Sequence, residues 1–367
     1  MKLILGQKQM LHTLITVTNY NHLPILSIHK VSCQSLIGSV LIFFYISSMK
    51  KLIFLLLIVP IISFGQSLSA EKKSFDNLFK KLDNTGKWGQ NDRLGTTNYI
   101  TSEKIKSSLK FVKKGVSVSL SFNISEDSLS PNYFNSDKLS KYSHEINELN
   151  FKGYNWVTDN FSISYHGHTH SHIDALNHLS HSGLYYNQLK SPDELGIENL
   201  KNGILTKGIL IDLPLLKGKE FIEAGYKIVV QDIIEFERKF NVKIERGDIL
   251  LIRTGRWKQK EIKGEWNFHV KSTGLHYDVM QLLSDREISV LGSDGTNDSN
   301  PPLIKEEGSP IHKLSIVAMG MPLLDNLNLE ELSKKAKVFS RWEFMLSIQP
   351  LKIDKGTGSP VNAIAIF

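Results

Sequence analysis

Histidine and aspartate side chains are concentrated in the segment YHGHTHSHIDALNH, residues 165–178, which holds five histidines and one aspartate. Neutral imidazole nitrogens and carboxylate oxygens are suitable ligands for Zn²⁺ or Mn²⁺. When three protein ligands leave one position open, the pKa of a bound water falls towards about 7, and the water becomes a nucleophile. The segment therefore predicts a catalytic metal centre.

The spacing of these residues predicts an extended backbone. Residues 161–166, FSISYH, alternate in polarity as a strand does. If this strand continues, the even positions share one face, because successive side chains point to opposite faces. A helix would instead rotate Asp174 about 200° away from His172. The residues on the shared face are His166, His168, His170, His172 and Asp174.

His178 lies four residues after Asp174. If the chain turns into a helix at Asp174, both side chains fall on one face of it. His178 would then lie beside the metal without being needed as a ligand, where it could shuttle a proton. The main alternative is a surface tract that scavenges metal, but such tracts are flanked by polar sequence, and this one follows an alternating strand.

Net charge and cysteine content exclude several other classes of function. The chain has 367 residues and a net charge of +7, of which five lysines before residue 67 account for +5, leaving +2 for the rest. This balance argues against a nucleic-acid partner. The single cysteine, Cys33, lies in the same N-terminal region, so the remainder has no disulfide, thiolate nucleophile or cysteine-ligated zinc.

The N-terminal region resembles an export signal. From Met49 the sequence reads MKKLIFLLLIVPIISFGQS, two lysines followed by an apolar run and then by small or polar residues. This layout predicts a signal peptide at 49–66, with residues 1–48 as an upstream extension, and a periplasmic or secreted protein that keeps no membrane span after cleavage. A membrane anchor is the alternative, but the lysine pair splits the apolar run.

Strand and helix patterns are mixed along residues 67–367, which predicts one domain of the α/β or α+β class. A polar stretch at 125–155 predicts a long loop that could act as a lid. Predicted strands are 115–123, 161–166, 208–214, 248–255, 288–294 and 361–367. Predicted helices include 67–87, one starting at Thr101, 229–239, 276–285 and 327–337.

The motif HTHSHIDALNH, residues 168–178, resembles the His-x-Gly-Thr-His-x-Asp-x-Pro-x-His motif of the putative cyclase family of metal-dependent hydrolases, which includes kynurenine formamidase and isatin hydrolase. The segments GDILLIRTGR, LGSDGTND and IHKLSIVAMGMPLLDNLNLEEL also resemble blocks of the larger bacterial members. The resemblance implies a compact α/β domain with a curved, barrel-like mixed sheet surrounded by helices, and a homo-oligomer. Here His170-Ser171 replaces the Gly-Thr, and Leu176 replaces the proline.

The resemblance also implies site residues. The first metal would be held by His168, His172 and Asp174, although His166 or His170 could replace His168. His178 would be the proton donor and acceptor. A second metal would use Asp174 again, together with His312 and with Asp325 in place of the family's glutamate.

The expected activity is hydrolysis of a carbon–nitrogen bond other than a peptide bond, in a formamide or cyclic amide, by metal-bound hydroxide. The alternative is a non-catalytic periplasmic protein that binds a metal or a small molecule.

Asp294 and Asp298 follow a predicted strand and are either site residues or turn formers. His276 is expected to begin a helix, and Gly356 and Gly358 to form turns.

Overall fold

The structure is a computed structural model that describes residues 16–20, 23–27, 41–42, 57–58, 69–125 and 142–367. The chain divides into two units, Met1–Ser69 and Ala70–Phe367. In the first unit, β1 (Thr16–Tyr20) pairs with β2 (Leu23–Ser27), and β3 (Leu41–Ile42) pairs with β4 (Leu57–Ile58). The predicted signal peptide lies outside the described residues except for β4, and it stays a prediction. No helix among the described residues is long and apolar enough to cross a membrane.

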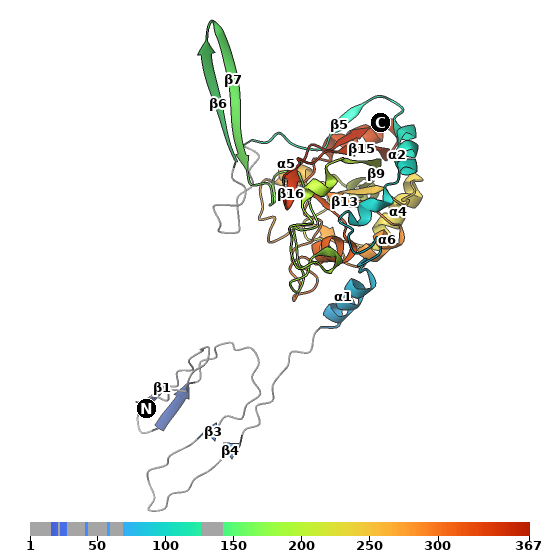
Figure 1. Cartoon of the computed structure of the whole chain (residues 1–367). Helices are drawn as coiled ribbons and strands as arrows, with labels where there is room; N and C mark the ends of the chain where they lie inside the picture. The colour runs from blue at the N-terminus through green and yellow to red at the C-terminus, as the bar shows by residue number, and fades with distance from the viewer. Residues whose placement is uncertain (1–15, 21–22, 28–40, 43–56, 59–68, 126–141) are drawn as a thin grey trace, which may run out of the picture. The chain divides into compact units, whose positions relative to one another are not determined.

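The second unit is built around a curved mixed sheet of nine described strands (Figure 1). Its four central strands, β14, β13, β11 and β9, run parallel, and both flanks are antiparallel. This arrangement confirms the predicted α/β class with a barrel-like sheet. In spatial order the strands are β16 (Gly358–Pro360), β8 (His172–Asp174), β14 (Leu323–Asp325), β13 (Val290–Ser293), β11 (Ile249–Arg253), β9 (Ile204–Asp212), β15 (Glu343–Ile348), β17 (Ile364–Ile366) and β5 (Ser117–Ser119).

The central strands are apolar on both faces, as strands covered on both sides must be. Along β11, Leu250 and Ile252 belong to one core cluster, whereas Ile249 and Leu251 belong to another. Helices and loops pack over these faces. The described helices are α1 (Ala70–Lys81), α2 (Ser102–Ser108), α3 (Leu213–Lys217), α4 (Val230–Phe240), α5 (Arg256–Lys263), α6 (Val279–Asp285), α7 (Pro310–His312) and α8 (Glu330–Phe339).

The predicted helices are confirmed. Thr101 caps α2, because its side chain accepts a hydrogen bond from the backbone N–H of Lys104. The helix α4 ends at Asn241, which adopts the left-handed conformation typical of helix ends. A short parallel pair, β10 (Lys227–Ile228) and β12 (Gly274–Leu275), lies outside the main sheet.

Two local predictions around the histidine segment are wrong. The strand through 161–166 does not continue, because β7 (Tyr154–Ile163) ends at Ile163 and β8 begins only at His172. Residues 164–171 form a loop between them. The chain also does not enter a helix at Asp174. It makes a turn instead, in which the N–H of His178 donates to the carbonyl of Ala175. Pairing of β8 on both of its edges, rather than local periodicity, sets these boundaries.

The loop predicted at 125–155 is wrong for its second half, and residues 126–141 lie outside the described residues. β6 (Tyr142–Phe151) pairs with β7 over ten residue pairs. Lys152 and Gly153 join them in a two-residue turn, and both have positive φ, as tight hairpin turns require. The hairpin extends away from the sheet (Figure 1). The polar composition of β6 obscured its alternation.

Candidate metal centre

The sheet register gathers three ligand-type side chains. In β8, His172 and Asp174 point to the same face, and Asp325 of β14 lies directly opposite His172. Ile173, between them, points into the core on the other side. All three polar residues are at most 3% exposed. Their ligand atoms lie within 4.8 Å of one another, which is close enough to hold one ion.

Asp174 lies at the centre of four imidazoles. Its Oδ1 is 3.1 Å from Nδ1 of His166, 3.6 Å from Nε2 of His172 and 4.0 Å from Nδ1 of His178. Its Oδ2 is 3.5 Å from Nε2 of His312. Within the described residues neither oxygen accepts a hydrogen bond of good geometry. A buried carboxylate left in this way is costly unless a charge is placed against it.

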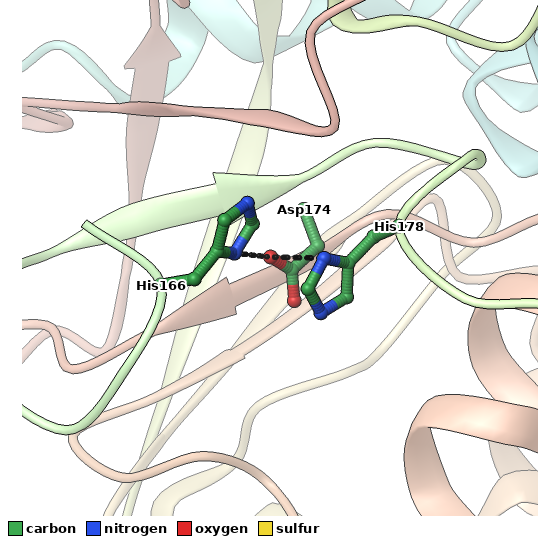
Figure 2. Close-up of side chains that lie close together, drawn as sticks. All are labelled: His166, Asp174 and His178. Atoms are coloured by element: carbon green, nitrogen blue, oxygen red, sulfur yellow. Dashed lines mark ion pairs between the residues drawn. The ribbon is translucent and has the colours of Figure 1, made fainter. Parts of the chain in front are cut away.

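His166 and His178 lie on either side of Asp174, and both direct Nδ1 towards the same oxygen (Figure 2). Their rings stack, with centroids 4.3 Å apart and an interplanar angle of 18°. The Nε2 of His166 lies 3.0 Å from the hydroxyl of Thr357. With Asp174 they form a second group whose ligand atoms lie within 4.8 Å of one another.

The tautomer of His172 is set by the backbone. Its Nδ1 donates a hydrogen bond of 2.8 Å to the carbonyl of His170, which leaves the Nε2 lone pair facing Asp174. Burial lowers the pKa of His172 to about 4. The ring is therefore neutral at neutral pH, which is the form that binds metal.

His312 and Asp325 are the other two ionisable residues next to Asp174 and His172. Burial alone would lower the pKa of His312, but contacts with Asp174 and Asp298 raise it well above its usual value. Burial raises the pKa of Asp325 to about 8, even though His312 opposes this effect. The Oδ1 of Asp325 accepts from Asn297, so Oδ2 faces His312 at 3.7 Å. A divalent cation would relieve this crowding of carboxylates.

His168 and His170, the other two histidines of the segment, do not join this cluster. His168 stacks on His269, with ring centroids 5.8 Å apart, and neither group of clustered ligand atoms among the described residues contains it. His170 is buried, and its carbonyl accepts from His172. The loop between β7 and β8 leaves His168 and His170 outside both groups of clustered ligands, although the spacing pattern placed all of these histidines together.

Asp294 and Asp298 have different roles. Asp294 accepts from the backbone N–H groups of Thr254, Gly255 and Arg256 and fixes the turn between β11 and α5. Asp298 instead holds Nδ1 of His312 at 2.6 Å. His276 does precede α6, where its ring accepts from the N–H of Asp278.

Arg256 and Gly358 position the site, and neither role was predicted. Arg256 donates to the carbonyl of His168 and to Asn326, whose side chain bonds the carbonyl of Gly167. Gly358 lies in β16 and not in a turn. A Cβ there would be 2.5 Å from the carbonyl oxygen of Ile173 and 3.0 Å from the His166 ring. Only the resemblance of GDILLIRTGR to the family pointed towards Arg256.

The clustered ligand residues line a cavity of about 290 Å³: His166, His172, Asp174, His178, His312 and Asp325. His168 and His269 line it as well. Thr296, Asn300 and Ser309 add neutral polar groups, and Leu179 adds an apolar one. The volume suits a small molecule beside the metal ligands.

Residues 118–297 match the family model described as "Putative cyclase", which confirms the resemblance seen in the motif. A crystal structure described as a novel cyclase is 27% identical and superimposes with a TM-score of 0.69, covering 79% of this chain and 99% of that one. Isatin hydrolase A from Ralstonia solanacearum is 20% identical, with a TM-score of 0.51 and coverage of 68% and 91%. Isatin hydrolase A from Labrenzia aggregata is 20% identical, with a TM-score of 0.50 and coverage of 68% and 93%. No curated protein matches the chain.

At their level of identity, the two isatin hydrolases show a shared fold. The cyclase match and the two groups of clustered ligands together support a hydrolase role with a metal centre.

Proposed function

We propose that the chain is a metal-dependent hydrolase that cleaves a carbon–nitrogen bond other than a peptide bond, in a formamide or a cyclic amide. The observation that carries the proposal is the carboxylate of Asp174, which is fully buried, accepts no hydrogen bond of good geometry from the described residues and is surrounded by four imidazoles. This donor set fits Zn²⁺ or Mn²⁺. The isatin hydrolases of the same fold act on a cyclic amide, which supports the substrate class.

The proposed ligands are His166, His172 and Asp174, with His312 and Asp325 available for a second ion. His166 replaces His168 in this set because its Nδ1 lies 3.1 Å from Asp174, whereas His168 stacks on His269. A bound divalent ion would polarise the substrate carbonyl and acidify a water molecule.

His178 is the proposed proton shuttle. Burial lowers its pKa, although Asp174 opposes this, so the ring is neutral at neutral pH and can accept a proton. It lines the cavity and remains partly exposed, with 28% of its side chain accessible. In this role His178 takes the proton of the attacking water and delivers it to the leaving nitrogen.

The cavity wall would orient the substrate. Thr296, Asn300 and Ser309 are neutral and can donate hydrogen bonds to an amide carbonyl or accept them from its N–H. Positioning of this kind contributes to rate by holding the reacting atoms together. A protein that only carries metal has no need of such a cavity, and this argues against the metal-carrying form of the non-catalytic alternative.

Hydrolysis of isatin and of formanilide by the metal-loaded chain, followed by absorbance, tests this proposal. His178→Ala should lower kcat about 100-fold or more, because general acid–base catalysis contributes that much. The control is His276→Ala, which removes a histidine that lies outside the cavity lining. If His178→Ala keeps full activity, the shuttle role is wrong. If it instead loses the metal, His178 is a ligand, as its grouping with His166 and Asp174 allows.

We also propose that the protein is exported, with the leader 49–66 removed. The lysine pair and the apolar run after Met49 support this. N-terminal sequencing of the protein from a periplasmic or culture fraction should find a start near Gln66. A start at Met1 or Met49 in a cytoplasmic fraction would contradict it.

A further inference from the structure

Residues 301–309 form a loop without regular secondary structure, and we call them the wall loop because they contribute to the cavity wall. The last two residues of the wall loop, Gly308 and Ser309, line the cavity. Its buried residues are Ile304, which is 1% exposed, and Glu307, which is 2% exposed. Because no strand or helix holds this segment, its position depends on these two buried side chains.

The two buried side chains hold the wall loop in different ways. Ile304 belongs to the same apolar core cluster as Phe75 of α1. Glu307 forms ion pairs with Lys72, also of α1, at 3.1 Å and with Lys313. The side chains of these lysines are only 14% and 20% exposed, so the pairs are largely shielded from solvent. Breaking a buried ion pair leaves an uncompensated charge, so the loop is strongly held at Glu307.

The helix α1 also contacts a second part of the cavity wall. Lys72, Phe75 and Phe79 are three and four residues apart, so they share one face of the helix. Phe79 packs on the ring of His181, with centroids 4.9 Å apart. Leu179, two residues earlier in that segment, lines the cavity and packs against the core cluster of Phe75. One face of α1 therefore supports two segments that line the cavity.

The proposed metal ligand in the next helix has an anchor of its own. Asp298 accepts a hydrogen bond from the backbone N–H of Ile311 and holds Nδ1 of His312 at 2.6 Å. The start of α7 and the ring of His312 are therefore fixed without the ion pairs of Glu307. Loosening the wall loop should displace Ser309 and leave the metal ligands in place.

We propose that Glu307 is a positioning residue for substrate binding. Its ion pairs with Lys72 and Lys313 hold the wall loop so that the hydroxyl of Ser309 can bond the substrate amide. Glu307 does not line the cavity, so it acts through Ser309. The inference rests on the proposed function, because it concerns the substrate of that reaction. Through Lys72, α1 becomes part of the binding site although it contributes no lining residue.

This role has a distinct kinetic signature. When a wall is in place in only a fraction of the molecules, the apparent affinity for the substrate falls by that fraction. A wall loop that is ordered about 10% of the time would raise KM about 10-fold. The complex, once formed, is the same as in the wild type, so kcat is retained. Damage to the metal centre would lower kcat instead.

The first test is steady-state hydrolysis of isatin and formanilide by the metal-loaded full chain. Glu307→Gln keeps the shape but not the charge, and it should raise KM about 10-fold or more while kcat changes less than about 3-fold. Metal content should not change. Lys72→Met leaves Lys313 as a partner and should raise KM less, and Glu307→Asp should restore part of the affinity. The control is Glu261→Gln, which removes a carboxylate 3.0 Å from Lys258 at a side chain 69% exposed and should leave KM unchanged.

Hydrogen exchange, followed by mass spectrometry, gives a second readout that does not require activity. Peptides covering residues 305–309 should exchange at least about 10-fold faster in Glu307→Gln than in the wild type, whereas peptides covering β8 should keep the wild-type rate. If Glu307→Gln does not fold, Lys72→Met decides in its place.

The two readouts separate this inference from the proposed function. If the wild type hydrolyses neither substrate, the proposed function fails, and the exchange rates alone decide whether Glu307 holds the wall loop. An active wild type with an unchanged KM in Glu307→Gln overturns the inference, and so do unchanged exchange rates. A loss of metal together with a fall in kcat overturns it as well, because Glu307 would then support the metal centre rather than the wall.

Discussion

Nδ1 of His312 lies 2.6 Å from the carboxylate of Asp298, and this contact turns Nε2 of the same ring towards the metal centre. Asp298 also accepts from the backbone N–H of Ile311, so one side chain fixes both the ring and the start of α7. A carboxylate behind a ligand histidine orients the ring and raises its basicity.

Asp298→Asn should therefore lower metal affinity about 10-fold or more without unfolding the protein, because the amide keeps the shape but not the charge. Isothermal titration with Zn²⁺ measures the affinity. The matched control is Asp278→Asn, which neutralises the partner of His276 at an exposed site where the two side chains lie 3.4 Å apart. Equal affinities for all three proteins would remove His312 from the proposed ligands.

Gly358→Ala should displace His166. A Cβ at this position would meet the Ile173 carbonyl at 2.5 Å and the His166 ring at 3.0 Å, so the strand or the ring must move. We expect a loss of metal affinity of about 10-fold with the fold retained, measured by metal titration and circular dichroism. Gly308→Ala is the control, because it lines the same cavity but its Cβ would have nothing within 4 Å. Unchanged affinity in Gly358→Ala would show that His166 is not a ligand.

Asp294→Ala should destabilise the fold rather than the chemistry. Its carboxylate accepts from three consecutive backbone N–H groups and from the hydroxyl of Thr254, all of them buried. Each buried donor left unpaired costs about 1–3 kcal/mol, so the free energy of unfolding should fall by about 3 kcal/mol or more. Urea unfolding of the metal-free protein measures this. Asp294→Asn keeps an acceptor and should lose less, and equal losses would contradict the account.

Local patterns in the sequence predicted the parallel core and its helices well. β9, β11 and β13 are short apolar runs, and α4 shows a clear helical period and ends before an asparagine in the left-handed conformation. The residues of each element are therefore enough to predict it. The histidine segment shows the limit of this reasoning. Strict alternation placed five ligands on one face, but the strand breaks between Ile163 and His172, so only part of the set faces Asp174.

The remaining site residues depend on contacts between distant segments. Asp325 opposes His172 through strand pairing across about 150 residues of chain, and Gly358 makes room for His166 from a third strand. No local periodicity encodes such a register. His312 and Asp325 could be predicted only through the family resemblance. For Asp298, the sequence did not distinguish a site residue from a turn former.

The most direct test of the account is the metal content per chain, by mass spectrometry, of the wild type, His166→Ala, His168→Ala and His172→Ala. The account predicts one or two Zn²⁺ or Mn²⁺ ions in the wild type, a loss in His166→Ala and His172→Ala, and retention in His168→Ala. Loss in His168→Ala with retention in His166→Ala would mean that the loop between β7 and β8 is arranged differently when metal is bound. A folded wild type without metal, even after incubation with Zn²⁺ and Mn²⁺, would contradict the proposed metal centre itself.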